Sequence, residues 1–314
     1  MSERLAATLE GPEDAPVVAL GTSIGTNQGL WDEQAPALRR HFRLLRFELR
    51  GHGPRGAQSP APPGPYTMAE LGTDVLALLN AHDIDQVAYC GVSLGGMVGM
   101  WLAANAPERM TRLGLCCTSA YLPPASMWTE RAARARSDGM ASLVDQVIAR
   151  WFTPAYFRRR PRQAGAVADM LEGTDPEGYA GCAEAIAAMD LRPVLPAITA
   201  PTLVIAATED PATPPWQGAQ IASAVPGARC PADRRPRRGS PGQLRSPRRD
   251  HRCAAGPPES ALVTAPIPFR HKPCAMRTAA HRMRHAVLGG SAGRRWNAAL
   301  VCRSGRTYRR ACDH

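Results

Sequence analysis

The sequence predicts an α/β fold in which a mostly parallel sheet carries helices on both faces and a helical cap is inserted between two strands. Short apolar segments alternate with segments of helical period up to about residue 120, which is typical of a parallel sheet. Residues 121–195 have helical periodicity only, and a strand-like segment follows at 200–207. A Gly-x-Ser-x-Gly sequence at 91–95 lies between a strand-like and a helix-like segment.

The first half of the chain supplies alternating elements. Before the serine we expect strand, helix, strand and helix at residues 15–21, 31–40, 42–48 and 68–79. After it we expect a helix of about 12 residues and a strand at 112–117. This order predicts a sheet covered on both faces.

Ser93 is the candidate nucleophile. Gly91 and Gly95 lack a Cβ, so strand and helix can approach closely enough for a strained turn that exposes the hydroxyl at a helix N-terminus. The free N–H groups there favour developing negative charge. The alternative is a glycine-containing loop without function, but the flanking strand and helix favour a nucleophile elbow.

Two backbone amides are candidates for an oxyanion hole. In hydrolases with such an elbow, one N–H comes from the residue after the serine and one from the loop after an early strand. These amides are those of Leu94 and of Ile24, in the small-residue loop Thr22–Thr26. The alternative for that loop is an ordinary turn.

A strand-end carboxylate is the candidate acid. Asp210 follows the strand-like segment 200–207, which fits the chain order serine, acid, histidine. Because Pro211 follows it, Asp210 could also be only a turn former. His52 precedes the serine, so this order does not favour it as the base.

The helical segment between residues 121 and 195 indicates a cap that encloses substrate and excludes water. Its helices are expected at residues 128–136, 140–152, 162–171 and 179–189. The alternative is an insertion without a binding role. We therefore divide the chain into two core parts, 1–120 and 196–229, the cap 121–195, and a C-terminal segment 230–314.

The C-terminal segment has a different composition. Residues 230–314 hold 19 of the 38 basic and 4 of the 27 acidic residues, so their charge is +15 and that of the rest is −4. After a helix at 216–224, residues 231–249 contain seven arginines and four prolines, and no strand is expected there. We expect an irregular tail.

A frameshift near residue 230 is one hypothesis for this change of composition. Codons chosen freely for residues 239–253 allow a shifted frame that encodes a histidine turn and a helix start about 30 residues after Asp210. An arginine- and proline-rich tail is also what a wrong frame of GC-rich DNA gives. Sequencing the gene across codons 225–245 tests the hypothesis.

Composition also bounds the class of protein. The nine cysteines show no paired or zinc-ligand spacing beyond Cys116–Cys117, which indicates reduced thiols. We expect no signal peptide, no membrane span, no metal, no cofactor and a cytoplasmic location. The basic tail leaves polyanion binding open, although no specific nucleic acid is expected as a partner.

Several segments together resemble bacterial 3-oxoadipate enol-lactone hydrolases, which have the α/β-hydrolase fold. The similarity covers roughly residues 12–229. It is carried by the segments Gly91–Arg109, Pro63–Tyr66, Ala149–Pro154, Pro176–Tyr179 and Ala207–Pro215. The resemblance implies hydrolysis of a small-molecule lactone to 3-oxoadipate in the catabolism of protocatechuate and catechol, with Ser93 as nucleophile and Asp210 as acid.

The implied lactone bears a carboxylate, so the cap should offer a cation. Trp128 and Arg131 lie three residues apart and share a helix face. Arg131 is the first candidate for the carboxylate partner and Arg134 the next, the alternative being solvated surface charges. The family's histidine has no counterpart, because His251, the nearest downstream, lacks the flanking pattern.

Other functions remain open at this point. The segment Met283–Gly289 resembles the start of a carboxymuconolactone decarboxylase, which follows the lactonase in some relatives. The chain could instead be a catalytically impaired protein of this fold with a polyanion-binding tail. A generic esterase is a third possibility, whereas a dehalogenase would need a carboxylate in place of Ser93.

Overall fold

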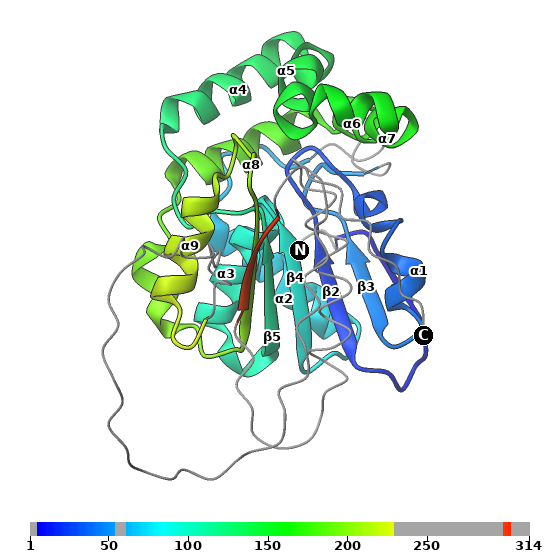
Figure 1. Ribbon diagram of the computed structural model, residues 1–314, viewed down its shortest axis with the longest axis vertical. Coiled ribbons are helices and arrows are strands. Elements are labelled where there is room, and N and C mark those ends of the chain that lie inside the picture. Colours follow the sequence, from blue (N-terminus) through cyan, green and yellow to red (C-terminus); the bar gives the residue numbers. More distant parts are fainter. Residues whose placement is uncertain (1–4, 54–60, 229–297, 303–314) are drawn as a thin grey trace, which may run out of the picture.

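A seven-stranded sheet forms the centre of the computed structural model, which describes residues 5–53, 61–228 and 298–302 (Figure 1). The strand order is β1-β3-β2-β4-β5-β6-β7, and every pairing except β1 with β3 is parallel. The strands are β1 Ala7–Glu10, β2 Val17–Gly21, β3 Arg43–Phe47, β4 Val87–Val92, β5 Met110–Cys116, β6 Thr202–Ala207 and β7 Ala298–Cys302. The predicted α/β-hydrolase fold is confirmed.

The central strand β4 is buried on both faces of the sheet. All six of its residues are buried, as expected for a strand that has side chains packed on both faces. One face is covered by α2 (Met68–Ala81), α3 (Leu94–Asn105) and α9 (Pro215–Ala224), whose apolar residues join the larger core. The other face packs against Trp31, Ala35 and Leu38.

The helix expected at residues 31–40 is shorter in the structure. A 3₁₀ turn, η1 (Gln28–Trp31), precedes the short helix α1 (Ala35–Leu38). Pro36 has no N–H with which to continue a hydrogen-bonded helix from Asp32, so the two pieces stay separate. Asn27 caps η1 through its side chain, which accepts from the amide of Gly29 at 2.9 Å.

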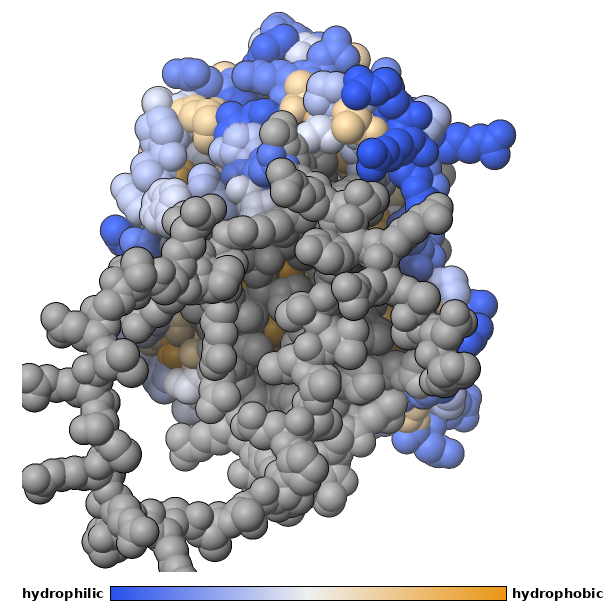
Figure 2. Space-filling view, in the orientation of Figure 1, coloured by the Kyte–Doolittle hydropathy of each residue, from blue (hydrophilic) through white to orange (hydrophobic). Residues whose placement is uncertain are grey.

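Five helices lie between β5 and β6, where four were expected, and they form the layer at the top of Figure 1. They are α4 Ala125–Asp138, α5 Ala141–Trp151, α6 Pro154–Arg159, α7 Pro161–Glu172 and α8 Pro176–Ala188. The additional helix is α6, which the side chain of Thr153 caps. The visible outer surface of this layer is mostly hydrophilic (Figure 2), while its apolar residues, such as Leu143, Val147 and Leu171, are buried.

The C-terminal segment contributes β7, which was not expected in an irregular tail. It pairs in parallel with β6 from Leu203–Ala298 to Ala207–Cys302. The proposed frameshift region and the segment Met283–Gly289 lie outside the described residues. Within the described ranges, no helix has both the length and the apolar character needed to cross a bilayer.

Candidate active site

Ser93 lies in a strained turn between β4 and α3. Its φ of +54° and ψ of −115° are rare for a residue with a side chain, and such strain concentrates at functional sites. The backbone on both sides fixes this turn, since the Ser93 amide donates to the Cys116 carbonyl at 3.0 Å. The Ser93 carbonyl accepts from Thr118 Oγ1 at 2.7 Å. The sequence and the structure therefore agree on the form of the elbow.

The two glycines of the elbow allow backbones to touch. A Cβ on Gly91 would lie 2.2 Å from the carbonyl carbon of Gly95. A Cβ on Gly95 would lie 2.5 Å from the backbone carbon of Gly21, at the end of β2. The Gly95 amide donates to the Thr22 carbonyl at 2.8 Å, so the elbow and the loop after β2 are joined directly.

The predicted oxyanion amides lie on the two segments that this bond joins. Neighbouring amides are engaged, because Gly25 donates to His52 Nε2 at 2.8 Å and Thr26 to the Ser23 carbonyl at 3.1 Å. The amides of Ile24 and Leu94 have no acceptor in the part of the chain that the structure describes. Both are thus able to donate to a ligand oxygen.

His52 does not have the environment of a catalytic base. Its side chain is 2% exposed, Nε2 accepts from Gly25, and Nδ1 lies 2.8 Å from the Arg50 carbonyl. Burial lowers the pKa of His52 to about 4. The other two histidines within the described ranges are His41, shortly before β3, and His82, at the end of α2 before β4. Both lie near N-terminal strand ends, whereas Ser93 and Asp210 follow C-terminal strand ends.

Asp210 follows β6 and is held rigidly. Its Oδ1 accepts from the amides of Ala212 at 2.8 Å and Thr213 at 3.0 Å, and its Oδ2 accepts from Thr213 Oγ1 at 2.8 Å. The side chain therefore forms the turn that the sequence allowed as an alternative. Oδ2 retains a lone pair for one further donor, so the turn leaves the role of triad acid available.

Arg131, on the cap helix α4, is buried. It is 8% exposed, and its guanidinium carbon lies 5.0 Å from the ring centroid of Trp128, whose Nε1 donates to the Leu122 carbonyl. Its Nε has no hydrogen-bond partner among the described residues. A buried guanidinium with an unused donor is suited to an anionic ligand.

Tyr179 of α8 connects this arginine to the oxyanion loop. Burial raises the pKa of the Tyr179 hydroxyl, and the positive charge of Arg131 opposes that rise. The Tyr179 ring also lies against Gly25, where a Cβ would be 3.2 Å from Cε2. Arg131, Tyr179 and the loop that carries Ile24 therefore converge.

Arg150 of α5 is a candidate binding residue that the sequence interpretation did not single out. Burial and the nearby charge of Arg131 lower its pKa, while the charge of Asp210 raises it. Arg150 is thus close enough to both Arg131 and Asp210 to feel their charges. The only sequence signal was its place in the segment Ala149–Pro154, which carries the family resemblance.

Arg134 was the second candidate for the carboxylate partner, and the structure places it elsewhere. Its side chain is 47% exposed, lies 3.9 Å from Asp138 and donates to the Ser142 carbonyl at 2.6 Å. The buried face of α4 consists of Trp128, Arg131, Ala132 and Ala135, and Arg134 falls outside it. We therefore retain Arg131 and not Arg134.

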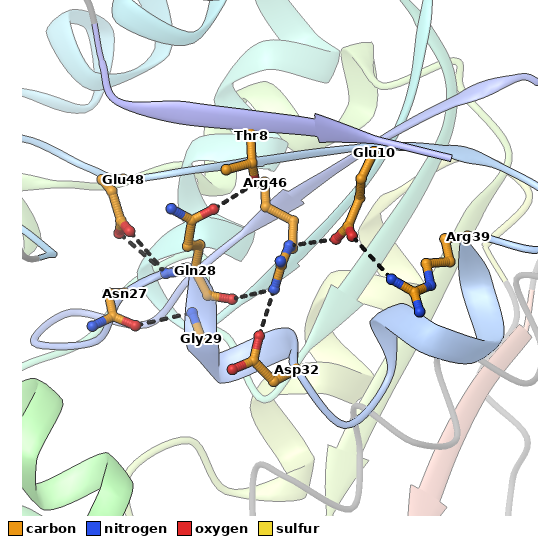
Figure 3. Close-up of polar contacts among 9 residues, drawn as sticks. All are labelled: Thr8, Glu10, Asn27, Gln28, Gly29, Asp32, Arg39, Arg46 and Glu48. Carbon is orange, nitrogen blue, oxygen red and sulfur yellow. Dashed lines mark hydrogen bonds and ion pairs between the residues drawn. The ribbon is translucent and has the colours of Figure 1, made fainter. Parts of the chain in front are cut away.

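A polar network supports the loop after β2 from the side of β3 (Figure 3). Both oxygens of the Glu48 carboxylate accept from the Gln28 amide, at 3.1 and 3.2 Å. Arg46 pairs with Asp32 at 2.6 Å and with Glu10 at 2.9 Å. Burial is the main cause that raises the pKa of Glu48 from 4.5 to about 7.

Glu48 should give the free energy of unfolding a specific pH dependence. The native carboxyl binds its proton more tightly than the unfolded one, so the contribution of Glu48 to stability is fully present below pH 4.5 and is lost as the pH rises toward 7. Relative to Glu48→Gln, the native chain should lose on the order of 3 kcal/mol over this range. Urea unfolding of both chains at several pH values measures the difference, and identical pH profiles would contradict the assignment.

No cluster of three or more His, Cys, Asp or Glu side chains within the described ranges could hold a metal ion.

Comparison with known proteins shows which family the chain resembles. The sequence profile of the alpha/beta hydrolase fold matches residues 16–149. A 3-oxoadipate enol-lactonase 2 from Acinetobacter baylyi is 37% identical over 203 residues, which cover 65% of this chain and 74% of the relative. More distant relatives include a protein of Yersinia enterocolitica named as a carbamate hydrolase, which is 28% identical over 204 residues.

Solved structures of two hydrolases also superpose on this chain. The enol-lactonase of Burkholderia xenovorans superposes with a TM-score of 0.69 at 43% identity, covering 72% of this chain and 86% of that one. A hydrolase from Pseudomonas aeruginosa superposes with a TM-score of 0.68 at 45% identity, covering 72% of this chain and 84% of that one.

Proposed function

Because this chain belongs to the α/β-hydrolase family, we propose that it hydrolyses 3-oxoadipate enol-lactone to 3-oxoadipate, with Ser93 as the nucleophile. The observation that carries the proposal is the strained serine, at the N-terminus of α3, beside the unpaired amides of Ile24 and Leu94. The enol-lactonase relatives support the choice of substrate. A role in the breakdown of aromatic compounds follows from this substrate.

The proposed reaction proceeds through an acyl-enzyme. The Ser93 hydroxyl attacks the lactone carbonyl, and the amides of Ile24 and Leu94 hold the oxyanion that forms. The ring oxygen leaves as an enolate, which takes up a proton and tautomerises to the ketone. Water then attacks the acyl group and releases the second carboxylate together with free Ser93.

Proton transfer in this scheme requires a base that Asp210 orients. His41, His52 and His82 do not have suitable positions, so we propose that the base comes from residues after Ala228. If the residues after Ala228 supply no base, the chain is the catalytically impaired protein that the sequence left as an alternative. It should then turn over no ester.

The cap supplies specificity in this proposal. Arg131 binds the carboxylate of the lactone, with Arg150 as the second cation and Trp128 as the surface on which the guanidinium packs. Enclosure beneath α4–α8 excludes water from these charges, so each charge-assisted hydrogen bond is strengthened. A neutral ester gains nothing from this part of the site.

Arg131→Ala should therefore raise KM for the lactone far more than for a neutral ester. Loss of a hydrogen bond to a charged group costs about 1.5–3 kcal/mol, which corresponds to a reduction of about 10- to 100-fold in kcat/KM. Steady-state kinetics with both substrates measure the effect. Arg134→Ala is the matched control, because that side chain is exposed on the same helix and should leave both substrates unaffected. Equal losses for lactone and ester in Arg131→Ala would remove the assignment.

A further inference from the structure

The segment after β3 turns back against the loop that carries Ile24. At its tip, the buried ring of His52 accepts from the Gly25 amide through Nε2 at 2.8 Å. The 2.8 Å contact of Nδ1 with the Arg50 carbonyl requires Nδ1 to carry the proton, so the ring is neutral and its tautomer is fixed. The low pKa of His52, about 4, keeps this acceptor available at neutral pH.

The start of the same segment holds the other side of the loop. Glu48 is 3% exposed and accepts from the Gln28 amide with both carboxylate oxygens (Figure 3). The Gln28 carbonyl in turn accepts from Arg46 at 3.4 Å. His52 and Glu48 thus hold amides on either side of Thr26 and Asn27.

The loop needs such support because its own backbone is permissive. Gly25 has a φ of +70°, in the left-handed region, and glycine has many other accessible conformations. The oxyanion amide of Ile24 immediately precedes this residue. A shift of the loop backbone at Gly25 would therefore carry the adjoining residue Ile24 with it and move the Ile24 N–H, which belongs to the preceding peptide, relative to the elbow.

We propose that His52 is a positioning residue for the oxyanion hole, which fixes the Ile24 N–H by holding the Gly25 amide, with Glu48 as the second anchor of the same loop. The inference rests on the proposed function in one respect, namely that Ile24 donates to the oxyanion. His52 itself touches no reacting atom, and it acts only through the backbone of the loop.

The kinetic test compares two replacements of His52. His52→Leu removes the acceptor, whereas the side-chain carbonyl of His52→Gln can accept from Gly25 near the position of Nε2. His52→Leu should lower kcat for the lactone by about 10- to 100-fold with KM within about threefold, since a displaced oxyanion donor acts mainly in the transition state. His52→Gln should recover most of kcat, and His82→Leu, at an exposed histidine, should have no effect.

Two results would overturn the proposal: an unchanged kcat in His52→Leu, or equal losses in the Leu and Gln variants. Thermal unfolding checks that the variants fold, and His52→Phe, which keeps a ring, replaces the Leu variant if that one does not fold.

A second measurement separates this inference from the proposed function. Hydrogen exchange of the Gly25 amide, followed by NMR on the labelled full chain, should be faster in His52→Leu than in the native chain and nearly native in His52→Gln. If the native chain does not open the lactone, the proposed function fails, and exchange alone decides on the anchor. Equal exchange in all three chains would contradict it.

Discussion

Replacing Ser93 by alanine should lower kcat for lactone hydrolysis by about six orders of magnitude, the loss found when the nucleophile of a comparable serine hydrolase is removed. The reason is that Ser93 carries the proposed nucleophilic hydroxyl, while the neighbouring Thr118 hydroxyl is engaged in donating to the Ser93 carbonyl. Disappearance of the lactone, followed by its ultraviolet absorbance at high enzyme concentration, measures the residual rate.

The fold should survive this replacement. The backbone strain at Ser93 is held by the bonds to Cys116 and Thr118, which involve only main-chain atoms of Ser93. The unfolding temperature of Ser93→Ala should therefore stay within a few degrees of the native value. A variant that is folded and retains more than about a hundredth of the native rate would contradict the role of Ser93.

Gly95→Ala should prevent the elbow from forming. The new Cβ would lie 2.5 Å from the carbonyl carbon of Gly21 and 2.8 Å from the amide nitrogen of Thr22, and backbone atoms in a packed sheet cannot move aside. We expect a loss of more than about 3 kcal/mol in the free energy of unfolding, or no folded protein. Urea unfolding followed by circular dichroism measures the change.

Gly165→Ala is the control for this experiment. Gly165 lies within α7, and a Cβ there would meet nothing within 4 Å. Alanine is the better helix former, so the same chemical change should stabilise the chain by about 0.5–1 kcal/mol. A Gly95→Ala chain as stable as the native one would show that the close approach is not required.

The sequence was most informative where local patterns dictate geometry. The glycines around Ser93 and the apolar strands predict the elbow, the parallel sheet and the helical insertion, since each depends on residues close together in the chain. The antiparallel edge strand β1 and the short helix α6 were not predicted, because both are too short for a periodic pattern to appear.

The cap side chains were harder to assign because their surroundings depend on packing between helices. Helical spacing placed Trp128 and Arg131 on one face and left Arg134 as a second candidate. Only the packing of α4 buries Arg131 and exposes Arg134. Arg150 belongs to another helix, so its proximity to Arg131 and Asp210 could not be predicted from the sequence.

His52 illustrates the same point in the core. The chain order of catalytic residues was enough to set it aside as a base, but nothing in the sequence indicated that its ring accepts from Gly25, 27 residues earlier. The residues after Ala228 contain five of the eight histidines, and these lie outside the described residues. The base that we propose would come from these residues, which are also the residues that the frameshift hypothesis concerns.

Covalent labelling tests the central claim, that Ser93 is an activated nucleophile. A fluorophosphonate reacts with a serine whose hydroxyl is activated by a base and whose oxyanion is stabilised. Incubation of the full chain with this reagent, followed by mass spectrometry of its peptides, should show about one adduct per chain, on Ser93. An unmodified Ser93, or an adduct at another residue, would contradict the account.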